Sequence, residues 1–290
     1  MIKSNKTSGF LFGLLSSACF GLIPLFTLPI MHKGMTFESI LLYRFIFACT
    51  AIAVMMFARK ESFRIQLKNI PSLLLLALLY DMSALFLFWG YEFMSSGVAT
   101  TIHFTYPVLT TLIMMVFFKE KKSAWRFIAI ALAVIGVFLL SYGDTSGQIT
   151  PTGLFIVLLS ALGYALYLAT ISQLRSRKMR GLPFTFYVFL FGTLFLLAGI
   201  ETTGNIQPIT DLGTVGYLFL LALIPTVVAN LALVKAIKSI GSTLSSVLGA
   251  MEPVTAVCVG ILVFGEAFTG SIGVGIALII SAVIIIILKR

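Results

Sequence analysis

Long apolar segments alternate with short polar connections along the whole chain. A helix needs about 20 apolar residues to cross a bilayer, and an apolar run of that length is typical of a membrane-spanning helix. Hydropathy predicts ten such segments, at about 8–30, 38–58, 70–92, 97–118, 125–142, 151–172, 182–201, 214–235, 242–264 and 268–288. No connection is long enough for a separate soluble domain. The pattern predicts an all-α membrane protein with ten transmembrane helices.

Two of these segments repeat one another. Residues 97–120 read GVATTIHFTYPVLTTLIMMVFFKE, and residues 243–266 read TLSSVLGAMEPVTAVCVGILVFGE. A shift of 146 positions places Pro107 on Pro253 and Glu120 on Glu266 without a gap. A proline inside a span removes a backbone donor and weakens the preceding turn. Because self-similarity of fixed period sets the architecture, we divide the chain into two five-helix repeats, 1–145 and 146–290.

The basic residues orient these repeats. With the N-terminus placed in the cytoplasm and the loops numbered alternately, 18 of the 20 Lys and Arg residues fall on the cytoplasmic side. Of the other two, Lys33 lies outside and Arg44 lies within a span. The positive-inside rule therefore predicts that both termini are cytoplasmic. Five helices per repeat is an odd number, so the two repeats insert in opposite directions. This 5+5 inverted repeat is the architecture of many secondary transporters.

Composition supports lipid as the solvent. The chain is 59% hydrophobic and 10% charged, whereas soluble domains carry roughly 25% charged residues. A net charge of +10 would suggest a nucleic-acid partner in a soluble protein. Here nearly all of the basic residues lie in one set of loops, so the orientation of the chain in the membrane explains the charge. The first apolar run is too long for a cleavable signal peptide. We expect a bilayer and a small-molecule substrate as partners, and no nucleic acid.

Four ionisable side chains lie deep in the predicted spans: Arg44, Asp81, His103 and Glu252. A charge at the bilayer centre costs at least ~2.5–3.5 kcal/mol, so such residues are functional candidates. Arg44 either forms an internal ion pair or cap, or holds a substrate carboxylate with its guanidinium. Asp81 either pairs with Arg44 or, if unpaired, becomes neutral and can carry a proton.

The other two candidates also have structural alternatives. His103 lies on a polar face one turn before Pro107, and it either faces the cavity or serves as an internal hydrogen-bonding group. Glu252 precedes Pro253 at mid-span, and it either faces the cavity or is tied to the backbone that the proline frees. Glu252 falls on Tyr106 in the first repeat, so the charge breaks the internal symmetry.

Aromatic and amide side chains are further candidates for the cavity wall: Trp89, Tyr164, Tyr167 and Asn230. Aromatic faces provide large contact areas and hold rings or cations. They suggest a substrate with a sizeable apolar part and a small charged group. Small residues at helical spacing allow close helix packing, within the chain or in a homodimer; they are Ala129, Ala133 and Gly136 in the fifth segment, and Gly273, Ala277 and Ser281 in the tenth.

The chain lacks a phosphate-binding loop, a His-Glu-x-x-His motif and a Cys-x-x-Cys motif. The buried ionisable residues are scattered singly, whereas a membrane-embedded enzyme needs a cluster of nucleophile, base or metal ligands. We therefore predict no catalytic residues, no metal, no cofactor and no enzymatic activity. A membrane-embedded enzyme and a channel remain as alternatives to a carrier.

These motifs resemble the drug/metabolite transporter superfamily, in particular its ten-helix EamA-type members. The family has a proline midway along the fourth and ninth spans and a terminal glutamate, often as Gly-Glu. Gly265-Glu266 matches this pattern, Lys119-Glu120 departs at its first position, and Glu252-Pro253-Val254 and Arg44-Phe45 are similar to further family signatures. The resemblance implies a 5+5 arrangement of helices around a central cavity and export of small metabolites, such as amino acids or drugs, across the bacterial inner membrane. A sugar or nucleotide-sugar carrier of the same superfamily is the alternative.

Overall fold

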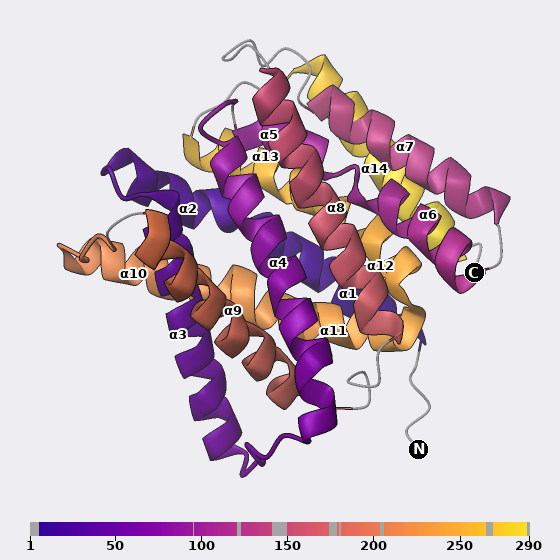
Figure 1. Cartoon of the computed structure of the whole chain (residues 1–290). Helices are drawn as coiled ribbons and strands as arrows, with labels where there is room; N and C mark the ends of the chain where they lie inside the picture. Colours follow the sequence, from indigo (N-terminus) through magenta and orange to yellow (C-terminus); the bar gives the residue numbers. More distant parts are fainter. Residues whose placement is uncertain are drawn as a thin grey trace.

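The structure is a computed structural model that describes residues 6–94, 96–120, 123–140, 150–173, 179, 181–203, 206–264 and 269–288. Within these residues every regular element is a helix (Figure 1). In chain order they are α1 (Lys6–Phe20), α2 (Ile23–His32), α3 (Phe37–Ala58), η1 (Leu67–Asn69), α4 (Ile70–Gly90), α5 (Ser96–His103), α6 (Tyr106–Phe118), α7 (Ala124–Leu140), α8 (Pro151–Gln173), α9 (Gly181–Thr203), α10 (Leu212–Ala222), η3 (Leu223–Val228), α11 (Ala229–Ile240), α12 (Ser242–Leu248), α13 (Met251–Phe264) and α14 (Gly270–Leu288).

The all-α prediction is confirmed, and each predicted segment overlaps one helix or a run of successive helices. Among the residues that the structure describes, seven segments are long and apolar enough to cross a membrane by length and composition, and three shorter apolar helices accompany them. The count of ten crossings stays a prediction, since α6, α7 and α14 fall among the shorter ones. The boundary at 145/146 and the motif residue Glu266 lie outside the described residues.

Helices from the first half of the chain pack mainly against helices from the second half. The closest partners are α7 with α14, α4 with α8, α1 with α11, and α3 with α9 (Figure 1). An added Cβ at Gly136 would lie 2.7 Å from the carbonyl oxygen of Gly275, so the fifth segment uses its small residues to approach α14. On α14, Ala277 and Ser281 are exposed and Gly275 and Ile279 face α7 instead, so packing of the predicted α14 residues in a homodimer stays a prediction.

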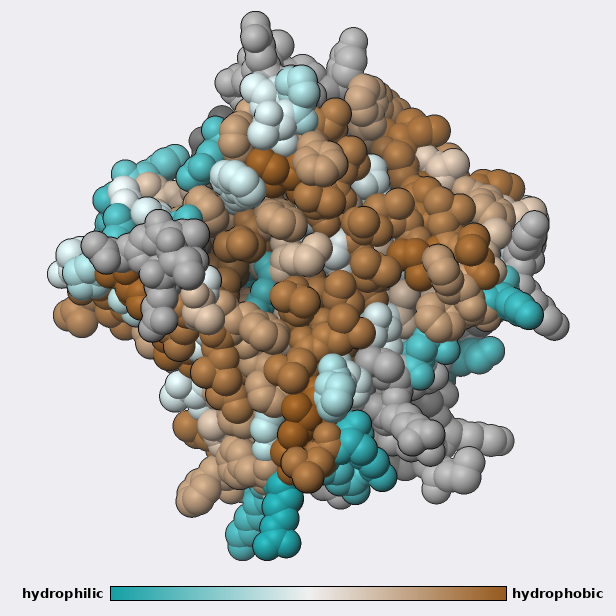
Figure 2. Space-filling model, in the orientation of Figure 1, coloured by the Kyte–Doolittle hydropathy of each residue, from teal (hydrophilic) through white to brown (hydrophobic). Residues whose placement is uncertain are grey.

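The outer surface is strongly apolar. Figure 2 shows hydrophobic residues across the middle of the visible face, with hydrophilic residues gathered towards its margins. Large apolar side chains that point outward include Phe57, Phe117, Leu262 and Val116. Exposed apolar patches of this extent are not found on ordinary soluble monomers, and they match a surface that lies in lipid.

Proline interrupts four of the long helical segments. Pro24 and Pro107 occupy the first turns of α2 and α6, just after the breaks at 21–22 and 104–105. Pro253 lies in the first turn of α13, after the break at 249–250, and Pro225 lies in the π-helical turn η3. Each proline lacks the N–H that would continue the preceding helix. The weakening expected at Pro107 and Pro253 is therefore seen as a break.

Polar contacts link the two halves at the end of the bundle that carries the α2–α3 connection. Lys33 Nζ lies 3.0 Å from Asp211 Oδ1, and the Tyr43 hydroxyl donates to the carbonyl of Gln207 at 2.9 Å. The Thr214 hydroxyl and backbone N–H and the Lys33 ammonium lower the pKa of Asp211 to about 2. A lowered pKa stabilises the fold above the ordinary carboxyl value, and this contribution is lost only as pH falls towards about 2.

Candidate functional site

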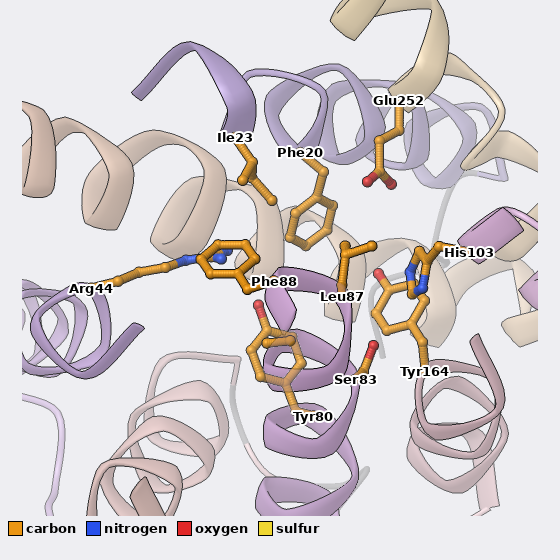
Figure 3. Close-up of a pocket in the computed structure, with 11 residues that line it drawn as sticks. Phe20, Ile23, Arg44, Tyr80, Ser83, Leu87, Phe88, His103, Tyr164 and Glu252 are labelled. Atoms are coloured by element: carbon orange, nitrogen blue, oxygen red, sulfur yellow. The ribbon is translucent and has the colours of Figure 1, made fainter. Parts of the chain in front are cut away.

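A small cavity lies at the centre of the helix bundle (Figure 3). Its volume is about 40 Å³, room for a few water molecules at most. The wall combines apolar side chains with a guanidinium, a carboxyl group, an imidazole and hydroxyls; it is made by Phe20, Ile23, Arg44, Tyr80, Ser83, Ala84, Leu87, Phe88, His103, Tyr164 and Glu252.

The interrupted helices meet at this cavity. Phe20 and Ile23 flank the break between α1 and α2, His103 ends α5, and Glu252 lies in the first turn of α13. Two of these breaks touch, because an added Cβ at Gly21 would collide with the carbonyl oxygen of Glu252. Irregular backbone at membrane depth is tolerated only where protein buries it or where it lines a cavity. The breaks therefore place His103 and Glu252 here, whereas Arg44, Ser83 and Tyr164 come from helices that continue past the cavity.

Arg44 is held by neutral partners from the second half of the chain. Its Nε donates to the Thr226 hydroxyl at 2.6 Å, and Nη2 lies 3.4 Å from the carbonyl of Pro225. The Thr226 hydroxyl donates in turn to the carbonyl of Leu221 at 2.8 Å, across the π-helical turn. The Arg44 side chain is only 2% exposed and lies 6.0 Å from the Phe88 ring centroid. Its guanidinium is thus fixed in place, with Nη1 left without a partner among the described residues.

The ion pair considered between Arg44 and Asp81 does not form. Within the described residues, Asp81 makes no hydrogen bond through either carboxylate oxygen, and Arg44 contacts no carboxylate. Asp81 is one position from Tyr80, which lines the cavity, but Asp81 itself does not line it. Successive residues on a helix point about 100° apart, so Asp81 faces α9 instead.

His103 presents a hydrogen-bond acceptor to the cavity. Its Nδ1 lies 3.0 Å from the Ser160 hydroxyl oxygen, which is 2.6 Å from the carbonyl of Ser83. The single hydroxyl proton of Ser160 is directed to that carbonyl, so Nδ1 of His103 must be the donor to Ser160. A neutral imidazole with its proton on Nδ1 has a bare Nε2. That nitrogen can accept a hydrogen bond from an N–H or O–H group of a bound molecule.

Glu252 points its carboxyl group towards the cavity from the side opposite Arg44 (Figure 3). Its side chain makes no hydrogen bond or ion pair with a described residue. The alternative in which Glu252 is tied to backbone freed by Pro253 is therefore not what the structure shows. Arg44 and the Glu252 carboxyl group thus face the same space without pairing with each other.

The aromatic candidates divide into three positions. Tyr164 lines the cavity, and its ring lies 4.7 Å from Tyr106 and 5.6 Å from His103 between centroids. Tyr167 lies behind the wall, against Tyr80 at 5.2 Å. Trp89 does not reach the cavity: it is 37% exposed and packs on Phe86 and Phe93. The assignment of Trp89 to the wall was wrong, because its helical position faces outward.

Asn230 supports the wall without lining it. Its Nδ2 donates to the Tyr80 hydroxyl at 3.1 Å and to the carbonyl of Thr226 at 2.8 Å. It therefore connects the tyrosine of the cavity wall to the turn that holds Arg44. The wall residues that the sequence analysis missed are mostly on α4, and the spacing of Tyr80, Ser83, Leu87 and Phe88 along one helical face is the signal that could have identified them.

Within the described residues, no three His, Cys, Asp or Glu side chains gather closely enough to hold a metal ion. The groups around the cavity are instead suited to non-covalent recognition. A guanidinium binds carboxylates and other oxyanions, a carboxylate and a bare imidazole nitrogen accept from cationic donors, and the aromatic rings contact apolar surface.

Comparison with known proteins identifies the family. The chain matches the EamA-like transporter family over residues 7–142 and again over 151–288. It is 25% identical over 237 residues to the uncharacterized transporter YdfC of Bacillus subtilis, covering 81% of this chain and 76% of YdfC. An uncharacterized transporter of Haemophilus influenzae is 26% identical over 289 residues, covering 96% and 93% of the two chains.

The solved structures agree on the fold. One crystal structure superposes with a TM-score of 0.83 at 15% identity, covering 97% of this chain and 96% of the other. The family and its relatives are named as transporters, in accord with the expectation that this chain is not an enzyme. Because the family match spans both halves and nearly the whole length, this chain belongs to the EamA-like transporter family and is a multi-pass membrane transporter.

Proposed function

We propose that this protein is a secondary transporter that exports small amphipathic metabolites across the bacterial inner membrane by alternating access. Both termini lie in the cytoplasm, and the two halves form an inverted repeat with five crossings each. The observation that carries this proposal is the central cavity, in which Arg44 and Glu252 face one space without pairing. Binding sites of inverted-repeat transporters lie at the interface of the repeats, next to broken helices.

The wall defines the class of substrate. Arg44 supplies a cationic group for a carboxylate or similar anion, and Glu252 with His103 Nε2 supplies acceptors for an ammonium or another donor. Phe20, Phe88 and Tyr164 supply apolar and aromatic contact area. The best match is a small zwitterion or charged molecule with an apolar body, such as an amino acid or a drug-like compound.

The cavity volume favours a carrier over a channel. At about 40 Å³ the cavity is far below the roughly 300 Å³ that an ordinary ligand pocket provides. A substrate can enter only if the helices around it move apart, and polar contacts such as Lys33–Asp211 connect the two halves. Transport then requires a cycle of opening and closing rather than a permanent pore.

Counterflow in proteoliposomes tests the proposed function. Vesicles loaded with one unlabelled compound from a panel of amino acids, aromatic cations, sugars and nucleotide sugars are given a trace of the same labelled compound outside. A carrier accumulates the label transiently, because exchange through one site is saturable. If loading the vesicles with unlabelled compound does not accelerate movement of the label, the result indicates a channel. If no compound of the panel is exchanged, the proposed substrate class is contradicted.

Tyr164 and Trp89 form a matched pair for the cavity. Tyr164→Ala is expected to reduce counterflow of the identified substrate by up to about tenfold, since an aromatic contact contributes about 0.5–1.5 kcal/mol beyond its area and 1.4 kcal/mol corresponds to about tenfold. Trp89→Ala removes an aromatic residue of the same helix bundle that faces away from the cavity, so little change is expected. Uptake rates of correctly inserted variants measure this, and equal losses in both would contradict the cavity assignment.

The orientation predicts different labelling for the two copies of the repeated motif. Lys122→Cys and Glu266→Cys are placed singly in a background with Cys19, Cys49 and Cys258 replaced by serine. We expect an impermeant thiol reagent added to intact cells to label position 266 but not position 122, because the motifs lie on opposite sides. Permeabilised cells provide the control for reactivity. Equal labelling from outside would exclude the inverted repeat.

A further inference from the structure

Asp81 is a second deeply buried carboxyl group, separate from the cavity. It lies midway along α4, is 6% exposed, and has no hydrogen-bond partner for Oδ1 or Oδ2 among the described residues. It does not line the cavity, and no role in substrate contact follows from its position. An ionised carboxylate without partners is strongly disfavoured away from water, so a protonated group is the form that fits this place.

The carboxyl group is sealed by α9. An added Cβ at Gly192 would lie 2.5 Å from Asp81 Oδ1 and 3.1 Å from Oδ2. Only a glycine lets the backbone of α9 approach this closely, and Gly192 is itself midway along its helix. Because α4 belongs to the first half of the chain and α9 to the second, Asp81 is buried at an interface that a movement of the two halves would open.

The titratable groups on the neighbouring helices do not bind Asp81 within the described residues. Arg44 of α3 binds Thr226, the Cys49 thiol of α3 lies 3.9 Å from the carbonyl of Phe186, and His103 of α5 binds Ser160. On α9 the Tyr187 hydroxyl donates to the carbonyl of Phe63. The remaining titratable or charged groups on the described parts of these elements are Glu38 and Tyr43 on α3, Lys68 on η1, Tyr80 on α4, and Tyr164 and Tyr167 on α8. None of them forms a hydrogen bond or ion pair with Asp81 within the described residues.

We propose that Asp81 is a proton-binding site at the α4–α9 interface, distinct from the substrate cavity, and that it couples transport to the proton gradient. When α4 and α9 separate, water reaches the carboxyl group, its O–H bond breaks, and the proton passes to water to leave a carboxylate. Before the helices close again on Gly192, the carboxylate takes up a proton from a hydronium ion, which becomes water, and the carboxyl group is then buried in neutral form. The coupling role rests on the proposed transport function, whereas the proton site itself does not.

Other groups at the interface between the halves are less suited to this role. The Lys33–Asp211 contact loses its charge only near pH 2, so it does not respond in the physiological range. Glu252 faces Arg44 across the cavity, where the proposed function assigns it to substrate contact. Asp81 is buried without a counter-charge in contact, which makes closure of this interface dependent on a proton.

Infrared spectroscopy of the purified full chain in lipid nanodiscs tests the proton site without any substrate. The wild-type protein is expected to show at neutral pH the carbonyl stretch of a protonated carboxyl group, and Asp81→Asn is expected to lose that band. Glu252→Gln is the matched control and is expected to keep the band that Asp81→Asn loses. A wild-type minus Asp81→Asn difference spectrum with no protonated-carboxyl band would overturn the proposal.

A second pair of variants covers the case in which Asp81→Asn fails to fold. In Gly192→Ala the added methyl group displaces the Asp81 carboxyl group from its contact with α9. The protonated-carboxyl band is therefore expected to shift, or to disappear at lower pH than in the wild type. Gly199→Ala lies on the same helix, where an added Cβ meets nothing within 4 Å, and should leave the band unchanged. Identical bands in both glycine variants and the wild type would overturn the proposed site.

The coupling role is tested in the proteoliposomes used for counterflow. In the wild type, an imposed pH gradient is expected to change the rate and extent of substrate movement, and in Asp81→Asn this response is expected to be lost. A response of wild-type size in Asp81→Asn would refute coupling through Asp81. Absence of counterflow in the wild type would instead contradict the proposed transport function, while the infrared result would stand.

Discussion

Glu252→Gln is expected to insert and fold normally but to lower the transport rate on the order of 100-fold. Losing one buried charge interaction costs about 2–5 kcal/mol at a binding interface, and each 1.4 kcal/mol corresponds to about a tenfold change. Glutamine keeps the size and hydrogen-bonding capacity of the side chain but not its charge. Since no described residue binds the Glu252 carboxyl group, the loss should fall on substrate contact rather than on folding.

The measurement is counterflow at saturating and trace substrate over a range of pH, with insertion checked by chromatography. Glu92→Gln is the matched control, because Glu92 lies on the connection after α4 and is exposed. We expect it to transport like the wild type. Wild-type rates and an unchanged pH profile in Glu252→Gln would show that Glu252 is structural.

Arg44→Gln is expected to abolish transport of anionic or zwitterionic substrates with little loss of thermal stability. Removing one partner of a buried ion pair usually destabilises a protein by about 3–5 kcal/mol, because the other charge is left unpaired. Arg44 contacts no carboxylate within the described residues and is held by neutral oxygens of Thr226 and Pro225. Removing its charge therefore leaves no buried counter-charge in contact with it.

Arg44→Lys separates charge from geometry. Lysine keeps the positive charge but lacks the planar fork that holds a carboxylate, so a weakened apparent affinity is expected with transport still detectable. Arg59→Gln, at the exposed end of α3, is the control for general effects of lost charge. The role of Arg44 in substrate binding would be contradicted if Arg44→Gln retained transport and its unfolding temperature fell as much as expected for a broken ion pair.

Much of the architecture is determined by the sequence. Lipid accepts only helices whose apolar residues run for about 20 positions, so hydropathy predicts where the helices lie, and α3, α4, α8 and α9 begin and end within a few residues of the predicted bounds. Proline acts locally on its own helix, so the breaks before Pro107 and Pro253 could be expected too. The cost of burying charge likewise selects Arg44, Asp81, His103 and Glu252 before any contact is known.

Only the tertiary structure decided which of these residues share a site. A helix in lipid is apolar on all sides, so hydropathy does not reveal which face turns inward. Trp89 therefore looked like a wall residue although it points outward, and Asp81 was a plausible partner for Arg44 although it packs on Gly192.

The partners that fix the site are also distant in the chain. Thr226 lies 182 positions from Arg44, and Ser160 lies 57 positions from His103. The helix packed against a side chain sets the direction in which that side chain points. Helices that pack together can be far apart along the chain, and nothing in the sequence indicates which of them are in contact. The chemistry of the cavity could thus be anticipated residue by residue, while its geometry required the folded pair of halves.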